Sequence, residues 1–423
     1  MFATLKNAWK IADLRKKLIF TMMMLLVYRI GNAIPVPYIN VESMSAYFQN
    51  ELSSTILGLY NAMSGSAFSQ ASVLALGIQP YINASIIIQL LTIAIPALER
   101  WAKEEGEMGK KKIERLTRYT TVALGLLLGF AYYTMIKNSG VNIITNDSFL
   151  AAVVIILAFA AGSSVVMWMG EKITESGIGN GISMILFANI VASLPATANT
   201  LFGANLFAWW AAVIIAVILL LLVVFIVFIN DAERRIPIQY AKRVVGRKIY
   251  GGQSTNMPIK VAMSGVMPVI FAQSICTMPA TICAFVGKTG GNWYKYVFDS
   301  NSAVYAVFYF ILIIAFSYFY AAVQYNPVEI ANNMKKNGGF IPGFRPGKST
   351  SDFIAKVITK ITLFGAMFLA VVALLPIITG AIIGNTSFAI GGTSVIIVVG
   401  VALETVNALE TQMLMRHYKG FLD

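Results

Sequence analysis

Mostly apolar segments, each about as long as a bilayer is thick, recur along this chain of 423 residues. A helix needs about 20 such residues to cross the hydrocarbon core of a membrane. Ten segments are predicted spans: Leu18–Ile34, Ser72–Ile95, Tyr119–Ile136, Phe149–Met169, Ile182–Leu194, Leu206–Ile229, Val261–Val286, Ala303–Val323, Val357–Ile383 and Thr393–Leu414. The chain has 57% hydrophobic and only 12% charged residues. It is therefore predicted to be an all-α polytopic membrane protein, since a β-barrel would show alternating strands of about ten residues.

The basic residues predict how the chain is oriented. All but Arg29, Lys137, Lys288 and Lys295 of the 32 Lys and Arg residues fall in or beside the N-terminal arm, every second connection and the C-terminal tail. Connections rich in Lys and Arg stay on the cytoplasmic side of a membrane. We therefore expect both termini to be cytoplasmic, as an even number of spans requires.

Two of the basic connections, Asn230–Lys260 and Asn326–Lys356, are about thirty residues long. Connections of that length are commonly functional or disordered, and the Tyr, Ile and Phe residues among these basic residues argue against disorder. Their charge has two readings. It can serve topology and attraction to anionic lipid, or it can dock a large anionic partner such as an acidic protein surface or ribosomal RNA.

The residues needed for several kinds of chemistry are missing from the sequence. The single histidine, His417, excludes histidine-based metal or triad chemistry inside the membrane. The stretch GFRPGKST places only three residues between Gly343 and Gly347, whereas a phosphate-binding loop needs four, and no buried strand is expected before it. We expect no catalytic activity, no metal and no cofactor.

Few ionisable residues fall within the predicted spans, and Arg29 and Glu404 are the clear cases. Ion-coupled transporters normally carry such residues, so a secondary transporter is the less favoured alternative, followed by an intramembrane hydrolase. Glu404 is expected to partner a helix dipole or a neighbouring Lys or Arg.

One membrane segment is broken. Ser53–Ser69 contains a short, mildly apolar piece that ends in Ser-Gly-Ser, and a true span follows beyond Gly77 and Pro80. Proline is tolerated near a helix N-terminus, and irregular backbone survives at membrane depth only where protein or water surrounds it. Ser53–Ser69 is either a re-entrant half-helix acting as a removable stopper or an ordinary external amphipathic segment.

Long stretches carry a resemblance to a known family. They are SGSAFSQASVLALGIQPYINASIIIQLL, EKITESGIGNGISMILFANIVASLP, RRIPIQYAKRVVGRKIYGGQSTNMPIKVAMSGVMPVIFA, NPVEIANNMKKNGGFIPGFRPGKST and GGTSVIIVVGVALET. With them, essentially the whole chain resembles the SecY family, the large channel-forming subunits of the bacterial Sec protein translocase.

The resemblance implies two pseudo-symmetric five-span halves, residues 1–200 and 201–423, around an hourglass pore. A plug is implied at about residues 55–70, including Thr55, Leu57, Met63, Ser64, Gly65 and Phe68. A pore ring is implied at Ile78, Ile82, Leu186, Ile270 and Ile397. Aliphatic side chains suit such a ring, because they form a deformable seal that disfavours water and ions by dewetting.

The family also opens sideways, between spans two and three and spans seven and eight. Polar residues implied at this lateral gate are Asn83, Gln89, Thr92, Gln273, Ser274 and Thr277. Basic residues implied in docking the SecA motor or the ribosome are Arg234, Arg235, Lys242, Arg243, Arg345 and Lys348. The implied partners further include the SecE and SecG subunits, signal peptides, secretory and membrane polypeptides, and lipid of the bacterial cytoplasmic membrane. The implied function is passage of secretory chains and lateral insertion of apolar segments.

Overall fold

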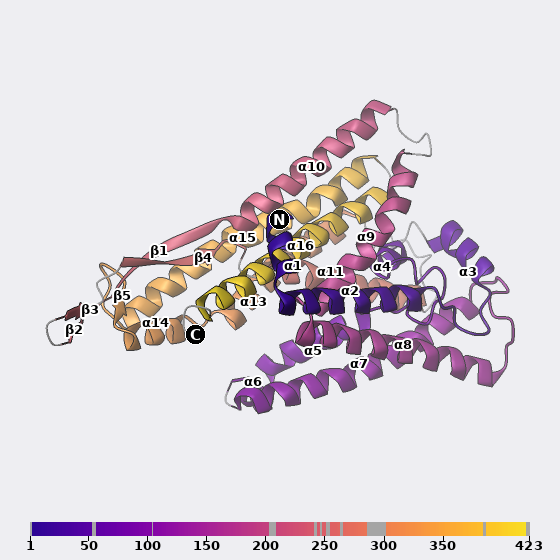
Figure 1. Cartoon of the computed structure of the whole chain (residues 1–423). Helices are drawn as coiled ribbons and strands as arrows, with labels where there is room; N and C mark the ends of the chain where they lie inside the picture. Colours follow the sequence, from indigo (N-terminus) through magenta and orange to yellow (C-terminus); the bar gives the residue numbers. More distant parts are fainter. Residues whose placement is uncertain are drawn as a thin grey trace.

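The computed structural model describes residues 2–52, 56–103, 105–202, 209–240, 243–245, 248–250, 254–262, 265–285, 302–383 and 386–419. Most of them are helical (Figure 1). The helices are α1 (Phe2–Lys10), α2 (Ala12–Asn32), α3 (Val41–Tyr47), the π-helix η1 (Phe48–Leu52), α4 (Ile56–Met63), α5 (Gln79–Ala94), α6 (Pro96–Lys103), α7 (Gly106–Lys137), α8 (Phe149–Ser176), α9 (Gly181–Phe202), α10 (Trp209–Asp231), α11 (Met267–Phe285), α13 (Ala303–Gln324), α14 (Pro327–Lys336), α15 (Lys348–Ile383) and α16 (Thr386–Lys419). The strands are β1 (Glu233–Tyr240), β2 (Arg243–Val245), β3 (Lys248–Tyr250), β4 (Ser254–Lys260) and β5 (Gly339–Phe340).

Each predicted span overlaps one helix, in chain order α2, α5, α7, α8, α9, α10, α11, α13, α15 and α16. By length and hydropathy, the segments able to cross a membrane among the described residues are Gly106–Lys137, Phe149–Ser176, Ala303–Lys336, Lys348–Thr379 and Ser394–Leu414. The pair α5 and α6, bent by 107° at the break before Pro96, adds a sixth. The chain is a mostly helical multi-pass membrane protein, and the count of ten spans stays a prediction.

The break before α5 follows from local sequence. Gly77 has a positive φ of 54°, a backbone conformation that glycine adopts without strain. Pro80 lies in the first turn of α5, where its missing N–H costs no hydrogen bond. The predicted second span therefore becomes helical only at Gln79, and Ser64–Ile78 runs as a series of turns between α4 and α5.

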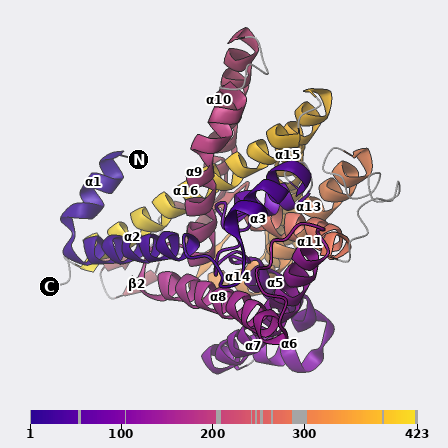
Figure 2. The ribbon, with the colours of Figure 1, turned by 90° about the vertical axis from the view of Figure 1, so that its right-hand side faces the viewer.

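Viewed along the bundle, α2, α7 and α8 lie toward one side, and α10 and α15 lie toward the other (Figure 2). Small residues allow the helices to approach closely. A Cβ atom on Gly125 of α7 would lie 2.6 Å from Ser163 Oγ of α8. A Cβ on Gly181 of α9 would collide with the carbonyl oxygen of Gly170 in α8. Such close approach is how membrane helices gain packing energy without a hydrophobic driving force between them.

An aromatic chain joins the broken segment to the bundle. The ring of Phe68 lies 6.0 Å from Phe48 and 4.7 Å from Tyr132 of α7, measured between ring centroids. Tyr132 in turn lies 4.6 Å from Phe159 of α8. Edge-to-face aromatic pairs add to the energy of burial, so this chain fixes the turn after α4 against α7 and α8.

The structure differs from the all-α expectation in the connection Asn230–Lys260. Strands β1 and β4 pair antiparallel with Ile236 opposite Met257, and β5 pairs with the end of β1. Along β1, Ile236 and Ile238 are buried while their neighbours are exposed, which is the alternation of a half-buried strand. This sheet projects with α14 at one end of the bundle (Figure 1).

The projecting strands have an apolar core of their own. It consists of Ile236, Ile238, Ile259, Ala331, Met334, Ile341, Ile354 and Ile358, contributed by β1, β4, α14, α15 and the turn between β5 and α15. Both long basic connections therefore fold against each other into one unit. Ile354 in the second turn of α15 is fully buried there.

We predict that Ile354→Ala loosens this unit, because deleting a fully buried Ile side chain leaves a cavity that costs about 2–5 kcal/mol. Trypsin should cut the β1–β4 hairpin faster in the purified variant. Val328→Ala is the control, since that side chain is 57% exposed. Equal cleavage of both variants and the parent would contradict a shared core.

Candidate functional site

The residues predicted to form a ring come from four separate parts of the chain. Ile78 precedes α5, Ile82 lies in its first turn, and Leu186, Ile270 and Ile397 lie on α9, α11 and α16. Each is at most 2% exposed, and all belong to one apolar cluster. The structure thus buries all five, and their convergence into a pore ring stays a prediction.

The predicted plug contains α4, which contacts α9, α11 and α16, the three helices that carry Leu186, Ile270 and Ile397. Leu57 and Phe68 are fully buried, and Met63 and Ser64 are at most 4% exposed. Gly65 adopts a positive φ of 67° at the end of the helix. Thr55 lies outside the described residues.

Sequence reasoning missed the groups that hold this segment. Asn189 Nδ2 of α9 donates to the Met63 carbonyl oxygen at 2.8 Å, and Asn32 Nδ2 of α2 donates to the Ser64 carbonyl at 3.3 Å. An Arg29 guanidinium nitrogen donates to the next carbonyl, that of Gly65, at 3.2 Å, and the Tyr132 hydroxyl donates to the Phe68 carbonyl three residues further on, at 2.7 Å. The signal available in the sequence was Asn189 itself, an amide within the predicted span Ile182–Leu194.

The predicted lateral-gate residues lie on two neighbouring helices. Asn83, Gln89 and Thr92 are on α5, and Gln273, Ser274 and Thr277 are on α11, which contacts α5. The hydroxyls of Thr92, Ser274 and Thr277 donate to carbonyls of their own helices. The amide oxygens of Asn83 and Gln273 are buried without a hydrogen-bond partner in the described part of the chain.

A hydrogen bond joins α5 to α13 and involves a residue that the sequence reasoning did not single out. The Tyr320 hydroxyl of α13 donates to Gln89 Oε1 of α5 at 3.1 Å. Phe271 of α11 packs against the Tyr320 ring with centroids 5.2 Å apart. α5 is thereby tied to α13, with α11 beside the contact.

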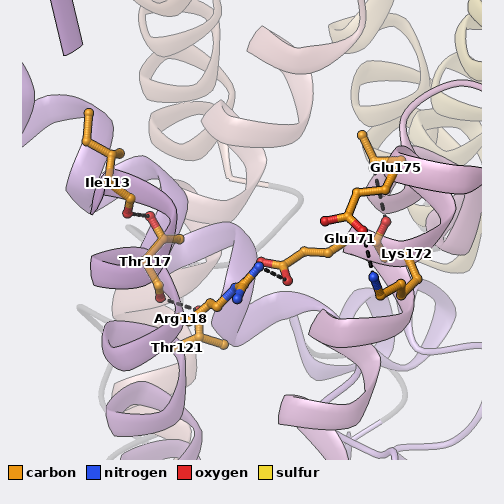
Figure 3. A network of polar contacts seen from close by, with 9 residues as sticks. Ile113, Thr117, Arg118, Thr121, Glu171, Lys172 and Glu175 are labelled. Atoms are coloured by element: carbon orange, nitrogen blue, oxygen red, sulfur yellow. Dashed lines mark hydrogen bonds and ion pairs between the residues drawn. The ribbon is translucent and has the colours of Figure 1, made fainter. Parts of the chain in front are cut away.

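A cavity of about 420 Å³ opens beside these residues. Its lining includes Ile82, Gln89, Ile270 and Tyr320. Arg118 of α7 and Glu171 and Glu175 of α8 line it as well. An Arg118 nitrogen lies 3.0 Å from Glu171, and Lys172, which is not part of the lining, lies 2.7 Å from Glu175 (Figure 3). The cavity therefore joins aliphatic ring candidates to a charged wall.

The start of α11 is fixed by Glu404 of α16. The Val266 backbone N–H donates to Glu404 Oε1 at 3.2 Å, immediately before the first residue of α11. A carboxylate is stabilising at a helix N-terminus, so the expected partnership of Glu404 with a helix end is confirmed. Gly265 has a positive φ of 58°, and a Cβ there would collide with the Glu404 carboxylate.

The predicted docking residues lie on the projecting unit. Arg234 and Arg235 are exposed on β1, where Arg235 pairs with Glu233 at 2.7 Å. Lys242 lies outside the described residues, and of Arg243 only the backbone, in β2, is described. Lys348 is the exposed first residue of α15.

Arg345 is exposed on a turn between Gly343 and Gly347, whose φ values are 87° and 111°. The turn is braced: Phe344 stacks near Phe353 with centroids 4.2 Å apart, and Thr350 Oγ1 donates to the Arg345 carbonyl at 2.8 Å. Contrary to expectation, a strand does precede the turn. It is the two-residue β5, paired antiparallel, which is no phosphate-loop setting.

These features define the class of protein. It is a helical multi-pass membrane protein with a broken span, and the short helix before the break, α4, packs inside the bundle. The family model for SecY matches residues 72–406. The Protein translocase subunit SecY of Streptomyces scabiei is 42% identical over 437 residues, and that of Bacillus licheniformis is 45% identical over 435, each covering all of both chains. The chain belongs to the SecY family.

Solved structures agree on the fold. A structure described as that of a protein conducting channel matches with a TM-score of 0.66 and 18% identity, over 94% of this chain and 92% of that chain. Sec61 in the canine ribosome-channel complex from the endoplasmic reticulum matches with a TM-score of 0.61 and 16% identity, over the same shares. At these identities the likeness concerns the fold alone.

We predict that Glu404→Leu lowers the thermal unfolding midpoint, because the Val266 N–H loses its acceptor and an unmade buried hydrogen bond costs about 1–3 kcal/mol. Glu404→Gln retains an acceptor oxygen and should stay close to the parent. The measurement is thermal unfolding of the protein purified in mild detergent. Identical midpoints for all three proteins would show that the contact contributes nothing.

Proposed function

We propose that this chain is the protein-conducting subunit of a protein translocase. It passes secretory polypeptides across the bacterial cytoplasmic membrane and releases apolar segments sideways into the lipid. The observation that carries the proposal is identity of 42% and 45%, along the entire chain, with curated protein translocase subunits. The channel has no catalytic activity of its own, so the energy for transport comes from partners.

The pore lies between an N-terminal half, residues 1–200, and a C-terminal half, residues 201–423, each with five of ten spans. Its waist is the ring of Ile78, Ile82, Leu186, Ile270 and Ile397. Support comes from the joint burial of these five side chains and from α4, which packs on three of the helices that carry them. A channel that must pass polypeptides of any sequence cannot rely on fixed hydrogen bonds to them. Branched aliphatic side chains instead seal the resting channel by their shape and by dewetting.

The lateral gate lies between α5 and α7 on one side and α11 and α13 on the other. The Gln89–Tyr320 hydrogen bond supports this assignment, because it ties the two sides together. Polar contacts between membrane helices are worth only about 0.6–2 kcal/mol. A gate held by such a contact opens when an apolar signal peptide packs in its place.

The projecting unit of β1, β4, α14 and the start of α15 is the cytoplasmic docking platform, and both termini lie on its side of the membrane. Its partners are the SecA motor and the translating ribosome, while SecE and SecG complete the channel. Support comes from the exposure of Arg234, Arg345 and Lys348 and from the braced turn beneath Arg345. Among the structural relatives, Sec61 is described in a ribosome-channel complex.

Replacing both Ile82 and Ile270 with Ser should make the resting channel leak ions, because hydroxyls admit water where branched aliphatic side chains exclude it. The measurement is conductance of the reconstituted complex in planar bilayers. Leu221→Ser is the control, since that side chain is 61% exposed on the outside of α10. Unchanged conductance in the double variant would remove the ring assignment.

Arg345→Glu should abolish motor-driven export while the protein remains folded, because the reversed charge repels an anionic docking surface. Arg345→Lys should restore export only in part, since a lysine cannot donate in the forked, two-pronged geometry of a guanidinium. The measurement is transport of a secretory precursor into inverted membrane vesicles. Normal transport by the Glu variant contradicts docking through this turn.

A further inference from the structure

We propose that the plug is latched through its main-chain carbonyls, and that Asn189, Asn32 and Tyr132 are the positioning residues that hold it closed. Arg29 adds an exposed fourth donor at the edge. This inference rests on the proposed function, in which residues 55–70 block the resting channel. It adds hydrogen bonds from side chains around the plug to the apolar burial of the plug's own side chains, such as Phe68.

The acceptors are the last carbonyl of α4 and the two carbonyls that follow it in the chain. The last carbonyls of an α-helix have no partner within the helix. Met63 ends α4, and the carbonyl oxygens of Met63, Ser64 and Gly65 receive, in that order, donors from Asn189, Asn32 and Arg29. Three consecutive carbonyls are thus bound by side chains from two helices, α9 and α2, that lie outside the plug.

Two of the donors, Asn189 and Asn32, are buried amides. Asn189 is fully buried, and its second amide hydrogen is donated to the Tyr28 hydroxyl at 2.8 Å. Asn32 is 5% exposed. Because a buried amide without a partner is unfavourable, each donor favours the plug in its seat.

Tyr132 provides a separate fastening from α7. Its hydroxyl donates to the Phe68 carbonyl at 2.7 Å, and its ring packs edge-on against the Phe68 ring. Tyr132 is fully buried, so no water competes for the hydroxyl. Hydrogen bonds therefore hold the plug both before Gly65, at Met63 and Ser64, and after it, at Phe68.

Recognition through carbonyls has a consequence for the sequence. Every residue offers the same carbonyl oxygen, so plug side chains can change while the donors cannot. Gly65 is the exception, because a Cβ there would lie 2.7 Å from Asn189 Oδ1 and 2.8 Å from an Arg29 nitrogen. The latch consists of several hydrogen bonds, each of modest strength. Bonds of this kind can be broken one after another, which suits a channel that must open.

The test is the accessibility of a cysteine placed in the plug. Ala67 is 1% exposed, so Ala67→Cys, made after replacing Cys276 and Cys283 with Ala, should react slowly with a membrane-impermeant maleimide. Tyr132→Phe and Asn189→Leu are then added singly and together. The control is Tyr309→Phe, because Tyr309 is as deeply buried but its hydroxyl has no partner among the described residues.

In the complex reconstituted into vesicles, Tyr132→Phe should speed labelling about tenfold, as expected for one lost buried hydrogen bond, and the double variant should exceed either single one. Tyr309→Phe should stay within about twofold of the parent. Parental labelling rates in both Tyr132→Phe and Asn189→Leu, or equal acceleration by Tyr309→Phe, would overturn the latch.

Precursor transport by the parent vesicles tests the proposed function separately. Faster labelling in vesicles that transport no precursor would support the latch and contradict the channel.

Discussion

The structure depends on one constraint: main-chain polar groups inside a membrane protein must find partners within the protein. A continuous helix satisfies its own groups, but a broken span does not. Between α4 and α5 the chain turns repeatedly from Ser64 to Ile78. From Met63 onward, some of its carbonyls accept from backbone N–H groups, and others take side-chain donors. Asn189, Asn32 and Tyr132 supply three of them, and the Tyr60 hydroxyl supplies another to Leu76. The position of the proposed plug is therefore set by hydrogen bonding as well as by its apolar burial.

The same constraint explains the contact between α16 and the start of α11, a helix of the proposed lateral gate. α11 begins with free N–H groups, and Glu404 of α16 accepts from Val266 there. Gly265 and Gly400 let the two segments approach, since a Cβ on either would collide with the other segment. One end of α11 is thus pinned. α11 also contacts α5 and α13, the two helices that the Gln89–Tyr320 hydrogen bond joins.

Much of the helical architecture could be predicted from the sequence, because apolar runs near bilayer length have few alternatives in a membrane. The break at Gly77 and Pro80 could also be predicted, because glycine permits a positive φ and proline fixes φ and lacks an N–H. The connection Asn230–Lys260 was not recognised as a β-hairpin. Its basic residues obscured the alternation of Ile236 and Ile238, and β5, its third strand, comes from a distant part of the chain.

The site could be predicted only in part. Motifs located the aliphatic residues that the structure buries together, but nothing in a sequence marks which carbonyl an asparagine will bind. Asn189 was not singled out from the sequence, and its acceptor Met63 lies 126 residues away. Tyr320 was likewise one aromatic residue among many on α13.

The most direct test of the central claim is photocrosslinking from the buried aliphatic cluster to a precursor stalled in transit. A photoreactive residue at Ile397, which is 1% exposed, should form adducts with the stalled chain. The same probe at Leu221, which is 61% exposed on α10, should react with lipid and not with the precursor. Adducts of the precursor at Leu221 with none at Ile397 would contradict a passage through this cluster.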